Sequence, residues 1–161
     1  MPTTFTYFAR DENDTERLGR ALADVAPHGV VALDGPLGAG KTRLVQAVAV
    51  AAGVDRRDVV SPTFVLLHEY RAPRPIYHLD AYRLGDDDEF LELGAHEHFG
   101  PPNLMFVEWA GRIERSLPAE RIDIAIEVVS ETERKFTIAG RGAEPAAAVE
   151  RLEQLLKKAD D

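Results

Sequence analysis

The sequence of 161 residues contains no cysteine. Without thiols the chain forms no disulfide, binds no metal through thiolate and performs no thiol redox chemistry, which fits a reducing interior. A chain of this length buries roughly two-thirds of its unfolded surface, so its core needs no covalent crosslink. We therefore expect a single domain over residues 1–161.

Long apolar runs are also absent. None of them comes near the roughly 20 residues of a membrane-spanning helix, and the N-terminus lacks the basic-then-apolar pattern of a secretory signal. Both absences lead us to expect a cytoplasmic protein with no membrane partner.

An excess of positive charge is the third feature that the chain lacks. Its 28 acidic residues outnumber its 19 basic residues, which gives a formal net charge of −9. Proteins that grip nucleic acid by themselves neutralise phosphates with a clustered basic face, so this balance argues against nucleic-acid binding by the chain alone. A local basic patch is still compatible with it.

Hydrophobic periodicity predicts alternating strands and helices in the first third of the chain. The expected elements are a strand at Thr3–Ala9, a helix at Asn13–Val25, a strand at Gly29–Asp34 and a helix at Lys41–Ala52. Asn13 and Glu16 have the spacing of a capping box at the start of the first helix. Gly53 follows the second helix, where a left-handed cap ends it.

The remainder of the chain predicts further strands and two helices. The expected strands are Pro62–Tyr70, Ile76–Asp80, Leu104–Trp109, Arg121–Val129 and Lys135–Ala139, the last two forming a hairpin. The expected helices are Glu89–Leu93, capped by the acidic run from Asp86, and Glu144–Ala159, whose role the sequence does not indicate. This order is typical of an α/β three-layer sandwich with a largely parallel central sheet and added antiparallel strands.

The segment Gly35-x-x-x-x-Gly40-Lys41-Thr42 lies between an expected strand and an expected helix, which is the context of a P-loop. Its glycines let backbone N–H groups turn inward, and the helix N-terminus adds about half a positive charge at the same spot. Lys41 would reach the β- and γ-phosphates of ATP, and the Thr42 hydroxyl would ligate Mg²⁺. The residues expected to contact the nucleotide here are Leu37, Gly38, Ala39, Gly40, Lys41, Thr42 and Arg43. The alternative is a glycine-rich turn with a solvated lysine. By chance, the four fixed positions of the motif should coincide in roughly one unrelated chain of this length in a few hundred.

A nucleotide site of this kind also needs an acidic group at the end of a neighbouring strand. Glu108 ends the apolar run Leu104–Val107 in the Walker B pattern, and Asp80 ends a less uniform run. Both are candidates to join Thr42 in ligating Mg²⁺ or to orient the attacking water, and Lys41, Asp80 and Glu108 form the expected catalytic set. Alternatively, either residue could be an ordinary carboxylate at a strand end or helix cap. The spacing of the motifs does not show which of the two would contact the metal.

Four short segments follow the P-loop motif. They are Ser61-Pro62-Thr63-Phe64, His78-Leu79-Asp80-Ala81-Tyr82-Arg83-Leu84, Glu108-Trp109 and Leu117-Pro118. Together with the motif, over about Leu18 to Val128, they resemble the TsaE (YjeE) family, the P-loop ATPase subunit of bacterial tRNA N6-threonylcarbamoyladenosine biosynthesis. The resemblance is specific because generic P-loop proteins lack the first two segments.

This resemblance implies an ATPase that uses ATP and Mg²⁺ and depends on two partners, a transferase subunit and its paralogue. It implies that the assembly modifies adenosine beside the anticodon of ANN-decoding tRNAs, so that tRNA is met indirectly. It further implies that hydrolysis is weak in the isolated subunit and resets the complex between turnovers, and that this subunit does not make the carbamoyl-adenylate.

The resemblance also implies switch segments that order around triphosphate and relax after hydrolysis. The residues assigned to them are Ser61, Thr63, Asp80, Tyr82 and Arg83, with Trp109 sensing the partners. The residues themselves allow other readings. Pro62 forces Ser61 out of helical geometry, as in a simple turn, and Tyr82 and Arg83 are equally compatible with packing and surface ion pairing.

Other charged and aromatic candidates are less distinctive. Among Arg43, Arg112 and Arg115, we choose Arg112 as an additional cofactor-binding residue because it lies four residues past Glu108. His78 alternates with Asp80 along one strand, so that it either faces the site or is a buried imidazole. His96 and His98 are expected at the surface.

Two other functional classes remain open from the residues alone. A small-molecule kinase would use the same P-loop, although the chain has few residues left for a substrate lid. A nucleotide-dependent switch protein is the other alternative, but no Asn-Lys-x-Asp motif for guanine is present, which favours adenine.

Overall fold

The computed structural model describes residues 2–26, 28–59 and 66–160. Its strands form one seven-stranded sheet in the order β1-β7-β6-β2-β5-β4-β3. Their bounds are β1 Thr3–Ala9, β2 Gly29–Asp34, β3 Leu67–Tyr70, β4 Ile76–Asp80, β5 Leu104–Glu108, β6 Arg121–Val128 and β7 Arg134–Arg141. The four central strands β6, β2, β5 and β4 are parallel, whereas β1, β7 and β3 pair antiparallel. The predicted sheet, largely parallel at its centre with added antiparallel strands, is confirmed.

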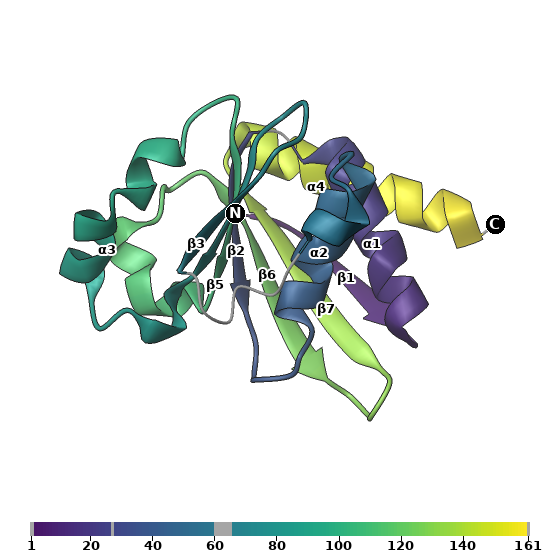
Figure 1. Cartoon of the computed structure of the whole chain (residues 1–161). Coiled ribbons are helices and arrows are strands. Elements are labelled where there is room, and N and C mark those ends of the chain that lie inside the picture. Colours follow the sequence, from purple (N-terminus) through teal and green to yellow (C-terminus); the bar gives the residue numbers. More distant parts are fainter. Residues whose placement is uncertain (1, 27, 60–65, 161) are drawn as a thin grey trace.

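Helices cover both faces of the sheet (Figure 1). The α-helices are α1 Glu12–Val25, α2 Lys41–Ala51, α3 Asp87–Leu93 and α4 Ala143–Asp160. Short 3₁₀ segments follow two of these helices and two of the strands. They are η1 Arg56–Asp58 after α2, η2 Ala81–Arg83 after β4, η3 Ala95–His98 after α3 and η4 Ala110–Ser116 after β5.

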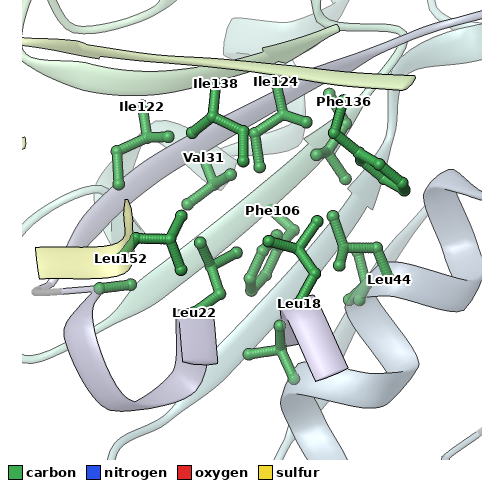
Figure 2. Close-up of a cluster of buried hydrophobic side chains, with 14 of the residues drawn as sticks. Leu18, Leu22, Val31, Leu44, Phe106, Ile122, Ile124, Phe136, Ile138 and Leu152 are labelled. Atoms are coloured by element: carbon green, nitrogen blue, oxygen red, sulfur yellow. The ribbon is translucent and has the colours of Figure 1, made fainter. Parts of the chain in front are cut away.

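The larger hydrophobic core lies between the sheet and the layer formed by α1, α2 and α4 (Figures 1 and 2). Figure 2 shows Leu18 and Leu22 of α1 beside the sheet residues Val31 and Phe106. The two helices α1 and α2 meet closely, because a Cβ at Gly19 would lie only 2.5 Å from the Cβ of Ala47. This packing fixes α2, and with it the loop that precedes α2, against the sheet.

The opposite face is covered only in part. Phe90 of α3 and Ile113 of η4 pack over Val30 and Leu79 in a second, smaller core. On the β1–β7–β6 side no such layer is seen among the described residues, and Phe8 of β1 is 64% exposed. The sandwich therefore has three layers around β2, β5 and β4 and two layers at the other end of the sheet.

Helix α2 begins at Lys41 as predicted, whereas α1, α3 and α4 begin one or two residues earlier than predicted. Helix α1 is capped by Asp11, whose carboxylate accepts a hydrogen bond from the Asp14 amide. The predicted capping box of Asn13 and Glu16 is therefore wrong, because Asp11, two residues earlier, caps the first turn of the helix instead. Helix α3 likewise begins at Asp87, with Asp86 as its cap.

Several predicted strands also have different bounds. Strand β5 ends at Glu108 instead of Trp109, because Trp109 adopts a left-handed backbone with φ of 58° and is the N-cap of η4. Strand β3 begins at Leu67, and residues 62–65 of the predicted strand lie outside the described residues. Strand β7 is longer than expected and reaches from Arg134 to Arg141.

Candidate functional site

The loop between β2 and α2 has the backbone that its glycines allow. Gly38 and Gly40 adopt φ angles of 81° and 107°, in the left-handed region that favours glycine. Gly35 lies so close to β6 that a Cβ there would be 2.7 Å from the Ile126 carbonyl oxygen. The loop thus combines left-handed turns with a helix N-terminus, which is the geometry of an anion-binding site.

Lys41 begins α2 and is almost fully buried. Its Nζ donates hydrogen bonds to the carbonyls of Gly35 and Pro36. It also lies 3.8 Å from the ring centre of Trp109, a cation–π contact. Burial lowers the pKa of Lys41 below its usual range, although nearby carboxylates, that of Glu108 above all, oppose this shift.

Glu108 lies at the end of β5 and is only 4% exposed. The Thr42 hydroxyl donates a hydrogen bond of 2.7 Å to Glu108 Oε2, and the buried His78 imidazole shares a second hydrogen bond with the same oxygen. Burial by itself raises the pKa of Glu108, but the hydrogen bonds from His78 and Thr42 and the charge of Lys41 lower it below its usual range. Glu108 is therefore a carboxylate at neutral pH, held in one orientation.

Asp80 lies beside Glu108, because the parallel register of β4 and β5 pairs these two residues. Its Oδ1 accepts a hydrogen bond of 3.0 Å from the Tyr82 amide and so caps η2. Asp80 is therefore a cap residue at the end of its strand, and its carboxylate also lines the hollow beside the P-loop. His78 likewise satisfies both of its readings, since it is buried and it contacts the site.

The hollow at this edge of the sheet has a volume of about 410 Å³. It is lined by Leu37, Gly38, Ala39, Gly40, Lys41, Thr42, Arg43, Asp80, Tyr82, Arg83, Glu108 and Trp109. The structure therefore brings the P-loop, the two carboxylates and one predicted switch segment together. Ser61 and Thr63 lie outside the described residues.

The two predicted arginines near the nucleotide are placed differently. Arg43 lines the hollow, while its guanidinium pairs with Glu12 at 2.8 Å. Arg112 does not line it and lies over the Tyr82 ring, at 5.1 Å from the ring centre. Tyr82 in turn contacts Trp109 at 5.1 Å between ring centres. Tyr82 and Trp109 thus form an aromatic rim of the hollow, with the Arg112 guanidinium packed over Tyr82.

The donor atoms of the hollow suit a magnesium ion. Thr42 and Glu108 already touch through oxygen atoms, Asp80 adds a neighbouring carboxylate, and Mg²⁺ prefers oxygen ligands. No group of three or more histidine, aspartate or glutamate side chains converges on one point in the described part of the chain. A magnesium ion here would therefore take much of its coordination from phosphate oxygens and water.

Sequence reasoning missed one residue of this region, Arg134. Its guanidinium donates to the carbonyls of Gly38 and Ala39, and with them it lines a second hollow of about 430 Å³ on the other side of the P-loop. The bond to Ala39 spans 95 positions of the chain. A single arginine beside a hairpin turn carries no local signal that would reveal such a contact.

Comparison with known proteins gives a family for this fold and site. The model of the family described as "Threonylcarbamoyl adenosine biosynthesis protein TsaE" matches residues 9–136. The chain belongs to the TsaE family. The matched range takes in the P-loop, the carboxylates and Arg134, whereas α4 lies beyond it.

Curated TsaE proteins from several bacteria are similar to most of the chain. That of Treponema pallidum is 34% identical over 81% of this chain and 97% of its own length. That of Bacillus subtilis is 39% identical over 80% of this chain and 81% of its own length. Each carries the name tRNA threonylcarbamoyladenosine biosynthesis protein TsaE.

A solved structure agrees with these relatives. The crystal structure of Bacillus subtilis YdiB superposes with a TM-score of 0.80 at 30% identity, and the match covers 96% of this chain and 97% of that one. The resemblance expected from the motifs is thereby confirmed, and neither the kinase nor the switch alternative gains support from the TsaE matches. In the described residues no helix is both long and apolar enough to span a membrane.

Proposed function

We propose that this TsaE chain binds and hydrolyses Mg-ATP as the ATPase subunit of tRNA N6-threonylcarbamoyladenosine biosynthesis. The hydrogen bond of 2.7 Å between Thr42 and Glu108, at the mouth of a P-loop, carries the proposal of ATP hydrolysis. The names of the curated relatives support the assignment to this tRNA modification.

The phosphates are held by the loop before α2. Its inward amides and the N-terminus of α2 bind phosphate oxygens, since both present partial positive charge to the hollow. Lys41 exchanges the carbonyls of Gly35 and Pro36 for phosphate oxygens, so that its charge stabilises the phosphoryl group during transfer.

Thr42, Glu108 and Asp80 are the proposed holders of magnesium. When bound, the ion neutralises charge on the phosphates and orients them for in-line attack. Thr42 keeps lone pairs for a ligand while its proton is donated to Glu108. Asp80 uses one oxygen to cap η2, and its other oxygen is the one proposed to join the magnesium ligands or to orient the attacking water.

The proposed partners are the transferase subunit and its paralogue, with tRNA met through them. The rim of Tyr82 and Trp109 is where a partner would sense the nucleotide, because Tyr82 is 51% exposed and Trp109 contacts Lys41. A cytoplasmic location belongs to the same proposal.

Replacement of Lys41 tests the site. We expect Lys41→Ala to lower Mg-dependent ATP hydrolysis by about 10²- to 10³-fold, because it removes a charge aimed at the transferring group. Lys135→Ala is the matched control, since Lys135 pairs with Glu127 on the open face of the sheet and its loss should leave the rate unchanged. Undiminished hydrolysis in Lys41→Ala would refute the site.

Addition of the two partners tests the process. Phosphate release and threonylcarbamoyladenosine formation are measured with the protein alone and with the transferase subunit and its paralogue from the same organism. We expect the partners to change the hydrolysis rate or to make product formation multi-turnover. If both stay unchanged, or if a phosphorylated small molecule accumulates, the proposed role in tRNA modification is wrong.

A further inference from the structure

Arg134 joins the β6–β7 hairpin to the outer side of the P-loop. Its Nε donates a hydrogen bond of 3.0 Å to the Ala39 carbonyl, and its Nη2 donates one of 3.4 Å to the Gly38 carbonyl. Its Nη1 donates to the carbonyls of Ser130 and Glu133, both at 2.9 Å. One guanidinium thus bridges two loops that lie far apart in the sequence.

The P-loop carbonyls need a donor from outside the loop. Gly38 and Gly40 have the left-handed backbone that is typical of anion-binding loops, in which N–H groups point toward the ligand and the carbonyls between them point away from it. The Gly40 carbonyl accepts the first bond of α2 from the Leu44 amide, but Ala39 precedes that ladder. Ala39 is 1% exposed, so an unpaired carbonyl there would carry the desolvation cost of a buried acceptor.

The hairpin holds Arg134 firmly in place for this task. Arg134 is the first residue of β7, and the ladder pairs it with Val128 of β6 and Ala9 of β1. The turn beside it is closed by a hydrogen bond of 3.0 Å from the Val129 amide to the Glu133 carbonyl. A planar guanidinium reaches acceptors on both loops at once, which the single ammonium of a lysine does less well.

We propose that Arg134 is a positioning residue for the nucleotide phosphates. By holding the carbonyls of Gly38 and Ala39 outward, it keeps the loop amides directed into the hollow before any ligand arrives. The inference rests on the proposed binding of ATP at this loop, and it makes the β6–β7 hairpin part of the phosphate site.

The test compares Arg134→Ala and Arg134→Lys with the wild-type protein. The dissociation constants of Mg-ATP and of tripolyphosphate, which has the phosphates without a nucleoside, are measured by calorimetry. Arg141→Ala is the control, because Arg141 lies at the other end of β7 and pairs with Asp123 away from the loop. Thermal unfolding of each variant shows whether its fold is kept.

We expect Arg134→Ala to weaken the binding of both ligands by about tenfold and to the same extent, because the charge-assisted hydrogen bonds to the Ala39 and Gly38 carbonyls are lost. Arg134→Lys keeps the positive charge but loses the planar guanidinium, so its dissociation constants should lie between those of wild type and Arg134→Ala. The dissociation constants of Arg141→Ala should equal those of wild type. If Arg134→Ala proves unfolded, Arg134→Lys with unchanged affinities would overturn the proposal.

Other outcomes separate this inference from the proposed function. A loss confined to Mg-ATP, with tripolyphosphate binding unchanged, would mean that Arg134 touches the nucleoside and does not position the loop. Equal affinities of wild type and both Arg134 variants would overturn the inference and leave ATP binding standing. Failure of the wild-type protein to bind either ligand would overturn both.

Discussion

Single carboxylates in this protein are held in their charged form by specific donors. Asp14 accepts hydrogen bonds from the backbone amide and from Nε of Arg10, both at 2.9 Å, and it is 8% exposed. The Arg10 side chain thereby lowers the pKa of Asp14 below its usual range. Because Asp14 also belongs to the first turn of α1, this interaction fixes the turn between β1 and α1.

The Asp14 interaction predicts a pH-dependent stability. A carboxyl whose pKa is depressed in the folded protein stabilises it above the ordinary aspartate pKa of about 4 and loses this effect as the pH falls through the folded value. We expect Asp14→Asn to cost about 1 to 3 kcal/mol at pH 7 and much less in strong acid. Denaturant unfolding between pH 7 and pH 2.5 measures this, with Asp24→Asn on the exposed side of α1 as control. A deficit that stays constant with pH would contradict it.

The sequence correctly predicted which residues lie together where local motifs place them. Lys41, Thr42 and Glu108 meet as their motifs indicate, with Thr42 bonded directly to Glu108. The sequence could not show that His78 shares the same carboxylate oxygen, because this contact depends on the register of β4 beside β5. Arg134 was missed for the same kind of reason, since its partners lie on another element.

At the scale of elements, the end of α1 is held by a residue from a distant loop. Arg74, between β3 and β4, donates hydrogen bonds to the carbonyls of Ala26 and Ala23 at 2.6 and 3.3 Å. Helix α1 has no basic residue in its own last turn. The guanidinium therefore satisfies carbonyls that the helix leaves open and favours the negative end of its dipole.

Removal of this cap should destabilise the fold. We expect Arg74→Ala to lower the free energy of unfolding by about 1.5 to 3 kcal/mol, the usual worth of hydrogen bonds from a charged group. Arg71→Ala, on the exposed part of the same loop, should change it by no more than about 0.5 kcal/mol. Urea unfolding measures both variants, and equal stabilities would show that Arg74 does not hold the helix.

Element boundaries show which signals are local. Gly53 ends α2 as expected, with φ of 107°, because a left-handed cap is encoded by the glycine itself. The start of α1 was misplaced because Asp11 and Asn13 are both good caps, and the structure uses Asp11 while Glu16 lies 3.8 Å from Arg43. A choice between equivalent caps is made by contacts with other elements.

At the scale of the whole molecule, a ligand that binds only the folded state stabilises it. If Mg-ATP binds as proposed, at one hundred times its dissociation constant it would add about 2.7 kcal/mol to the free energy of unfolding, which for a chain of this size corresponds to roughly 5 to 10 °C in the unfolding temperature. We expect this shift for Mg-ATP in wild type and none in Lys41→Ala. Thermal unfolding with matched concentrations of GTP is the comparison, and an equal shift by GTP would contradict the preference for adenine.

The sequence by itself determined the loop, its lysine and threonine, the strand-end carboxylates and the family, because each of these depends on residues that are close in the chain. It also predicted the mixed sheet from the alternation of strands and helices. Only the tertiary structure decided that the second helical layer covers β2, β5 and β4 and that, among the residues the structure describes, no such layer covers the same face of β1, β7 and β6. It alone decided that His78, Arg74 and Arg134 reach the elements they support, because strand order and helix packing bring together residues between 30 and 95 positions apart.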